Sequence, residues 1–198
     1  MIQFDFQQNY VLENNRIKLI PLSEEHISDL LPFSMQEAEI WKYSLQQPIG
    51  EEKLKLYIAN TLNKRKLGQE YAFVVFDKKS QEFAGSTRFY SIDFDNESLE
   101  IGYTWYGKNF QGTGLNKNCK FLLLAFAFEQ LNIKRVGFQA DSNNARSIAA
   151  MKSIGCTLEG VLRGYSKKPD GDRRDSAILS ILQSEWFKTV KEMLLKKI

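Results

Sequence analysis

The chain has 198 residues, enough for one substantial hydrophobic core, and its hydrophobic (43%) and charged (26%) fractions argue against a disordered or fibrous protein. Lys and Arg outnumber Asp and Glu by only 27 to 24 and are spread along the sequence, which argues against a dedicated nucleic-acid-binding protein. Two cysteines without metal-ligand spacing, no secretory signal and no bilayer-length apolar run predict a cytoplasmic protein without a metal or a membrane partner.

The order of the predicted elements indicates one α+β domain over residues 1–198, because no repeat or linker divides the chain. Ser23, followed by two glutamates, predicts the first helix start, and Ser184 predicts the last. Runs of strands with helices between them predict a mixed sheet with helices on both faces. The expected strands are 16–21, 71–76, 83–92, 99–106, 135–140, 161–166 and 175–182, and the expected helices lie within 23–67, 115–131, 144–154 and from 184 onward.

Regular alternation in the strand over 99–106 predicts which side chains share a face of the sheet. One face is expected to carry Glu100, Gly102 and Thr104. The other is expected to carry Leu99, Ile101, Tyr103 and Trp105.

A glycine-containing turn follows this strand and precedes a buried helix. Its sequence is Gln111-Gly112-Thr113-Gly114-Leu115-Asn116. Glycines let the backbone approach a ligand closely, and a helix N-terminus offers free N–H groups and a positive dipole end to a pyrophosphate. Two interpretations are open, a phosphate site or a tight turn that needs two flexible residues.

A second block, Asn144-Ala145-Arg146-Ser147 running on to Gly155, combines with the turn and with the segment Leu99-Glu100-Ile101-Gly102-Tyr103-Thr104-Trp105. Together the three blocks resemble the GNAT superfamily of acetyltransferases, in particular the RimJ/RimL branch related to ribosomal-protein N-terminal acetyltransferases. With compatible elements on either side, the resemblance covers about residues 16–186.

The resemblance implies a GNAT-type acyl-CoA N-acyltransferase fold, with a mixed, mostly antiparallel sheet and a splayed central strand pair. Acetyl-CoA is the implied cosubstrate, its pantetheine arm lying where the strand of Trp105 and Tyr106 leaves its parallel neighbour around Gln139. Backbone groups of Trp105 and Tyr106 would face the thioester and pantetheine, and Asn144 would bind the pantetheine arm. The diphosphate would be held by backbone N–H groups of Gln111, Gly112, Thr113, Gly114, Leu115 and Asn116.

Two positions depart from the family pattern: Asn116 ends the glycine motif, and Met151 stands where many relatives carry a tyrosine that protonates the departing thiolate. A thiol with a pKa of about 8.5 leaves tolerably without an acid, and Ser147 or solvent is the expected substitute. Glu100 is the expected base, directly or through water, with a strand-edge ion pair as the alternative. Deprotonating an α-amine costs on the order of 1 kcal/mol at pH 7, and a lysine about 4 to 5 kcal/mol.

Other chemistry-bearing side chains are weighed against structural roles. The single histidine, His26, is expected at the surface. Both cysteines are expected to be packed, so that transfer is direct and no acyl-enzyme forms. Core packing and a place in the acceptor pocket are both open for Phe33, Trp41 and Tyr43. A position near the acceptor or a dimer contact and a position on a solvated basic face are both open for Arg163, Tyr165, Arg173 and Arg174. Contact with coenzyme phosphates and an ordinary surface position are both open for Lys117 and Lys120.

The sequence therefore predicts an N-acetyltransferase that moves acetyl from acetyl-CoA directly to a primary amine, with a protein or peptide N-terminus as the leading acceptor and a possible homodimer as the assembly. A small-molecule amine, such as a polyamine, amino acid or antibiotic, is the alternative within the same reaction. A non-catalytic acyl-CoA-binding module and an ATP-binding protein are alternatives of other classes. No Gly-Lys-Ser/Thr follows the turn, which argues against ATP.

Overall fold

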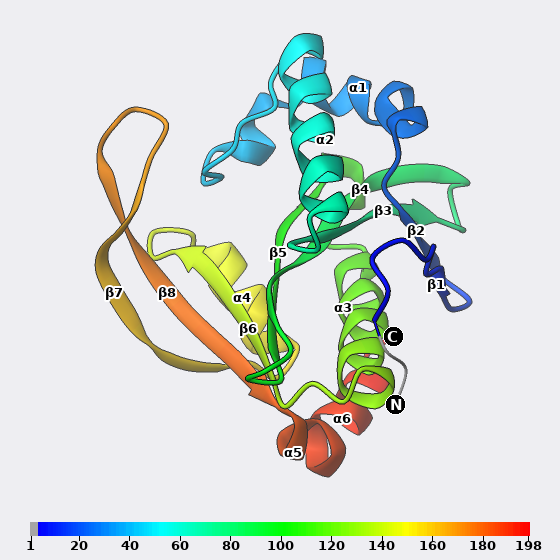
Figure 1. Ribbon diagram of the computed structural model, residues 1–198, viewed down its shortest axis with the longest axis vertical. Helices are drawn as coiled ribbons and strands as arrows, with labels where there is room; N and C mark the ends of the chain where they lie inside the picture. The colour runs from blue at the N-terminus through cyan, green and yellow to red at the C-terminus, as the bar shows by residue number, and fades with distance from the viewer. Residues whose placement is uncertain (1–3) are drawn as a thin grey trace.

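The computed structural model describes residues 4–198, and its strands form an eight-stranded sheet in the order β1-β2-β3-β4-β5-β6-β8-β7 (Figure 1). All neighbouring pairs are antiparallel except β5 and β6, which are parallel. This confirms the predicted mixed, mostly antiparallel sheet. The strands are β1 (Leu12–Glu13), β2 (Ile17–Pro21), β3 (Tyr71–Asp77), β4 (Glu82–Asp93), β5 (Ser98–Tyr106), β6 (Arg135–Asp141), β7 (Thr157–Lys167) and β8 (Arg173–Leu182).

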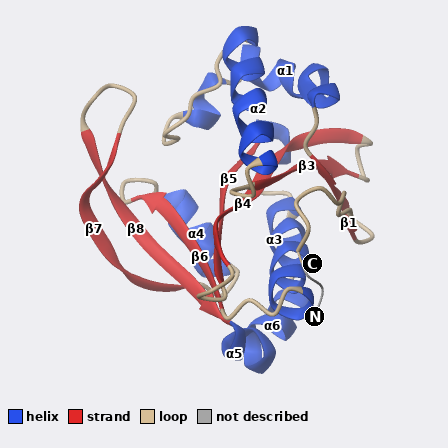
Figure 2. Ribbon diagram, viewed as in Figure 1, coloured by secondary structure: helices blue, strands red, loops and turns tan. Residues whose placement is uncertain are grey.

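Helices cover both faces of the sheet, as predicted (Figure 2). Side chains of β3 alternate between two hydrophobic clusters: Tyr71, Phe73 and Val75 join one, whereas Ala72 and Val74 join the other. The first cluster contains the apolar faces of α3 (Leu115–Ala125), α4 (Ala145–Ser153) and α6 (Lys191–Leu195). The second contains those of α1 (Ile27–Gln36) and α2 (Glu51–Lys66). No helix within residues 4–198 is long and apolar enough to span a bilayer.

The predicted strands and helices are present, strand β1 was not predicted, and two of the differences in boundaries have clear causes. Strand β7 begins four residues before the expected start, because Thr157 already pairs with Ser180 of β8. Ser184 does not cap the last helical segment: Leu182 is the N-cap, and its N–H donates to the Glu185 carboxylate at 2.8 Å. The cap lies there because β8 stays paired with β6 up to Leu182.

A bulge in β5 overturns the expected alternation of this strand. Ser86 pairs with Trp105 and Arg88 with Gly102, so one residue of β4 lies opposite two of β5, and Tyr103 has φ +48°. An inserted residue moves every later side chain to the other face. Ile101 therefore packs on the α3 side and Trp105 on the α2 side, although both were expected on one face. Thr104 likewise reaches α3, where Lys120 contacts it.

A buried ion pair supports the bulge from the α2 side. The Arg88 side chain is 1% exposed, and its Nη1 lies 2.5 Å from Glu70, which also binds Lys64 at 2.6 Å. The Arg88 guanidinium stacks on the Tyr103 ring at 4.2 Å and on the Tyr57 ring at 4.9 Å. The pair therefore holds Tyr103 in its left-handed conformation from one side.

Removing the acid should leave the Arg88 cation buried and uncompensated. We expect Glu70→Ala to lower the free energy of unfolding by about 3 to 5 kcal/mol, measured by urea denaturation. Glu51→Ala is the matched control, because it removes one side of an exposed pair with Lys55 and should leave the midpoint unchanged. Equal midpoints for the two variants would show that the buried pair contributes nothing.

Candidate functional site

The cleft of this protein opens where β5 and β6 part. Their parallel pairing is limited to Ser98 with Arg135, Leu99 with Val136, and Glu100 with Gly137. Beyond Glu100 the two strands diverge, as expected for a splayed pair. A cavity of about 880 Å³ begins there and is lined by the rest of β5, the end of β6, the glycine turn, the first turns of α3, one face of α4, and residues 39–45.

The glycine turn presents a row of free amides to this cleft. Gly112 and Gly114 have φ values of +78° and +84°, and a Cβ at either position would meet nothing within 4 Å. Within residues 4–198, no acceptor is bonded to the N–H groups of residues 112–116, which end at the start of α3. Neutral donors at a positive helix end fit a diphosphate.

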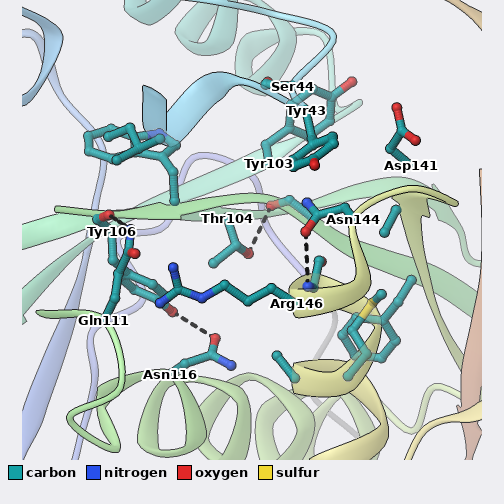
Figure 3. Close-up of a pocket in the computed structure, with 18 of the residues that line it drawn as sticks. Tyr43, Ser44, Tyr103, Thr104, Tyr106, Gln111, Asn116, Asp141, Asn144 and Arg146 are labelled. Carbon is teal, nitrogen blue, oxygen red and sulfur yellow. Dashed lines mark hydrogen bonds between the residues drawn. The ribbon is translucent and has the colours of Figure 1, made fainter. Parts of the chain in front are cut away.

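Gln111, expected to share in this row, is used inside the protein. Its backbone N–H donates to the carbonyl of Lys108 at 3.1 Å. Its side-chain Nε2 donates to the carbonyl of Tyr106 at 2.7 Å and ties the turn to the end of β5 (Figure 3). Five amides are therefore available to a ligand, one fewer than expected.

Tyr106 and Asn144, which were expected near the coenzyme arm, both line the cleft and are held in place by hydrogen bonds within the protein. The Tyr106 hydroxyl donates to Asn116 Oδ1 at 3.2 Å. Asn144 caps α4, since its Oδ1 accepts the N–H of Ser147 at 3.0 Å. Asn144 lines the cleft, and among the described residues no acceptor is bonded to its amide hydrogens.

Arg146 is a residue that the sequence-based assignment missed. Its side chain runs across the cleft toward Tyr106 and Asn116 (Figure 3). Within residues 4–198 the guanidinium has no ion pair. The sequence did contain a signal for Arg146, because it lies in the first turn of a predicted helix. The helix dipole disfavours a cation at that position unless an anion is bound nearby.

The expected base and acid lie on opposite sides of the sheet. The Glu100 carboxylate accepts the Tyr90 hydroxyl at 2.5 Å and Gln139 Nε2 at 2.9 Å. Glu100 borders a smaller cavity of about 200 Å³, whereas Tyr90 and Gln139 also line the main cleft. Burial, then the Glu100 charge, raises the pKa of Tyr90, which therefore stays a donor. Ser147 lines the main cleft from α4.

Aromatic and basic side chains form the far end of the cleft. Tyr43 (36% exposed) and buried Trp41 line it, and the Trp41 ring packs against Trp105 at 5.1 Å. Arg174 also lines it: its Nη1 donates to the Tyr43 carbonyl at 3.0 Å, and its Nε is buried without a partner in the part of the chain that the structure describes. Residues outside the lining of this cleft are Phe33, Arg163, Tyr165 and Arg173.

The remaining candidates have structural surroundings. Both cysteines are free and buried, and His26 packs against the ring of Phe83 away from the cleft. Lys117 lines the cleft, but Lys120 is neither at the surface nor at the mouth, because it is 5% exposed. In the part of the chain that the structure describes, no three His, Cys, Asp or Glu side chains gather as metal ligands do.

Residues 16–157 match the model of the "Acetyltransferase (GNAT) domain". The chain is 29% identical to "Uncharacterized N-acetyltransferase p20" of Bacillus licheniformis over 80% of its length and 89% of that protein. It is 27% identical to "Putative ribosomal N-acetyltransferase YdaF" of Bacillus subtilis (strain 168), over 89% of this chain and 95% of that protein. A GCN5-related N-acetyltransferase from Brucella melitensis has the same fold, with a TM-score of 0.88, 23% identity, and 97% and 86% of the two chains covered.

The free amides depend on the left-handed glycines, which gives a direct test. Gly114→Ala places a Cβ at φ +84° and costs about 1 to 2 kcal/mol of strain. We expect the Kd for coenzyme A, measured by calorimetry, to rise roughly tenfold as the turn relaxes and moves its amides.

Gly171→Ala is the matched control, because Gly171 has φ +90°, equally open space and a place in the β7–β8 turn. Both variants should lose similar thermal stability, but Gly171→Ala should keep the wild-type Kd. Unchanged coenzyme affinity in Gly114→Ala would contradict a role for these amides.

Proposed function

The chain belongs to the GNAT acetyltransferase family, and from this premise we propose that its acceptor is the α-amino group of a protein or peptide. Acetyl-CoA is the acetyl donor and supplies an activated acetyl group on a thiol. What supports this acceptor is a cleft whose far end offers one donor for a peptide carbonyl, the Arg174 Nε–H, which has no partner in the described residues. The name of the Bacillus subtilis relative, which describes a ribosomal N-acetyltransferase, points the same way.

Coenzyme binding is proposed at the glycine turn and along the parted strands. The N–H groups of residues 112–116 would hold the diphosphate, and Arg146 and Lys117 would add positive charge beside it. Asn144 would donate its free amide hydrogens to the pantetheine arm, while the backbones of Trp105 and Tyr106 border that arm. This arrangement needs only a few cations, since the turn supplies neutral donors.

The acceptor is proposed to enter between residues 41–45 and β8. Tyr43 and Ser44 lie near the surface there, so an extended chain end can reach the cleft from solvent. The buried Arg174 Nε–H has no partner within residues 4–198, and a peptide carbonyl would satisfy it. An amine without a carbonyl group, such as a polyamine, would leave this donor unsatisfied, which favours a peptide over a polyamine.

Glu100 is proposed to take the proton that the acceptor amine loses. Its carboxylate is fixed by Tyr90 and Gln139, which both reach the cleft, so a water at their tips or the Tyr90 hydroxyl would connect it to the amine. An α-amine needs little help at neutral pH, so this indirect path suffices. Ser147 is proposed to donate a hydrogen bond to the coenzyme arm from the opposite wall.

The acceptor proposal is tested by thiol release from acetyl-CoA. The acceptors are a peptide with a free N-terminus, the same peptide N-terminally blocked but with a free lysine, and spermidine. The free α-amine should react on the order of a hundredfold faster than the lysine, because more of it is neutral at pH 7. Turnover with spermidine alone would replace this proposal by a small-amine acetyltransferase.

The base proposal predicts a separate effect for Glu100→Gln. We expect kcat at pH 7 to fall on the order of a hundredfold, with the coenzyme A Kd unchanged, because the amide still accepts the Tyr90 hydrogen bond but takes no proton. The exposed Glu82→Gln is the control and should match the wild type. Full activity of Glu100→Gln across pH would exclude Glu100 as the base.

A further inference from the structure

Lys120 of α3 is a buried cation without a counter-ion. Its Nζ lies 2.7 Å from Thr104 Oγ1 and 3.2 Å from Thr87 Oγ1, and the two hydroxyls are 2.8 Å apart. No carboxylate within residues 4–198 lies within 4 Å of this ammonium. By contrast, buried Arg88 has Glu70 as its partner. A buried charge without a partner is costly, so Lys120 needs an explanation.

The location of Lys120 suggests that its charge serves a group bound in the cleft. An ammonium has three donors, and Thr87 and Thr104 occupy two of them. Lys120 and Thr104 line the same cleft as Ser147 and Met151 of α4. The third N–H can therefore serve a group bound in the cleft, on the side opposite to Glu100.

No neighbouring group among residues 4–198 supplies the missing negative charge at neutral pH. The titratable groups around Lys120 are the thiols of Cys119 and Cys156 and, beyond Cys119, the Tyr106 hydroxyl. Burial raises the pKa of all three, that of Cys156 to about 12, so they are uncharged. Burial also lowers the pKa of Lys120 and makes it a more willing proton donor than a surface lysine.

We propose that Lys120 gives its proton to the sulfur of the departing coenzyme A. Met151 cannot do this, because its thioether has no proton to donate. As the bond from the acceptor nitrogen to the acetyl carbon forms, the carbon–sulfur bond breaks and its electron pair stays on sulfur. The Lys120 Nζ proton moves to this sulfur, which leaves a neutral amine. The proton that the acceptor amine loses restores the ammonium through solvent. This inference rests on the coenzyme site proposed above.

Chemistry favours Lys120 over Ser147 in this role. An unperturbed lysine has a pKa of about 10.4 and a thiol has a pKa of about 8.5. Burial lowers the pKa of Lys120 and so brings it closer to that of the thiol. Proton transfer is most effective between groups of similar pKa. The ammonium is charged and attracts a developing thiolate, whereas a neutral alcohol offers only a hydrogen bond.

The alternative role for Lys120 is purely structural, as a tie between Thr87 and Thr104 across the bulge. A readout that a tie would not affect is the thiol of bound coenzyme A. Its ionisation can be followed by ultraviolet absorbance of the thiolate against pH in the wild-type complex. We expect the pKa of the bound thiol to lie at least one unit below that of the free coenzyme, because the ammonium stabilises the thiolate. An unshifted thiol would overturn the proposal without any variant.

Two substitutions then separate proton donation from charge and packing. Lys120→Met should remove the shift of the thiol pKa and lower kcat on the order of a hundredfold. Lys120→Arg keeps the charge but does not release a proton. This variant should therefore keep part of the shift in the thiol pKa, and its kcat should still fall. Wild-type kcat in Lys120→Arg, or an unchanged thiol pKa in Lys120→Met, would overturn the proposal.

Controls keep these outcomes distinct from failure of the coenzyme site. Desulfo-coenzyme A lacks the thiol, and its Kd should be equal in the wild type and Lys120→Met. If the wild type bound neither coenzyme, the proposed coenzyme site would be wrong, and the proton-donor proposal would be overturned with it. The exposed Lys66→Met removes the same charge from α2 and should match the wild type in both readouts.

Discussion

The parting of β5 from β6 is the constraint on which the rest of this structure depends. Three paired positions hold the strands together, and beyond Glu100 their facing backbones no longer satisfy one another. An unpaired backbone in a sheet must find other partners, so the gap is suited to an amide-bearing ligand. The pantetheine arm of the proposed coenzyme has such groups. The bulge at Tyr103 then decides which side chains border the gap from each face.

The two faces of the sheet have different chemistry at this gap. Glu100, Tyr90 and Arg174 lie on the proposed acceptor side, and Lys120 and Ser147 lie on the side of α3 and α4. Amine deprotonation and thiol departure would therefore occur on opposite sides of one opening. Such a layout suits direct transfer, because neither proton-transfer group needs to approach the other. It also explains why the cysteines can remain buried in the core.

The cations in and near the cleft have different surroundings. The proposed anion site would use neutral amides at a helix start, and Arg146 reaches across the cleft toward them. Deeper in the protein, Arg88 is neutralised by Glu70 and supports the bulge, whereas the partners of Lys120 among residues 4–198 are hydroxyls. Arg88 is therefore a structural charge, whereas the proposed role of Lys120 leaves its charge available to a ligand.

The sequence by itself determined the element types, the hairpins, the glycine turn and the family, because periodicity, turn residues and short motifs are local properties. Only the tertiary structure decided the bulge in β5, the burial of Lys120 and the contact of Arg174 with Tyr43. Each depends on a residue elsewhere in the fold: Thr87 lies 33 positions from Lys120 in the chain, and Arg174 meets the Tyr43 carbonyl across 131. Such contacts exist only after the sheet has formed, so no local pattern encodes them.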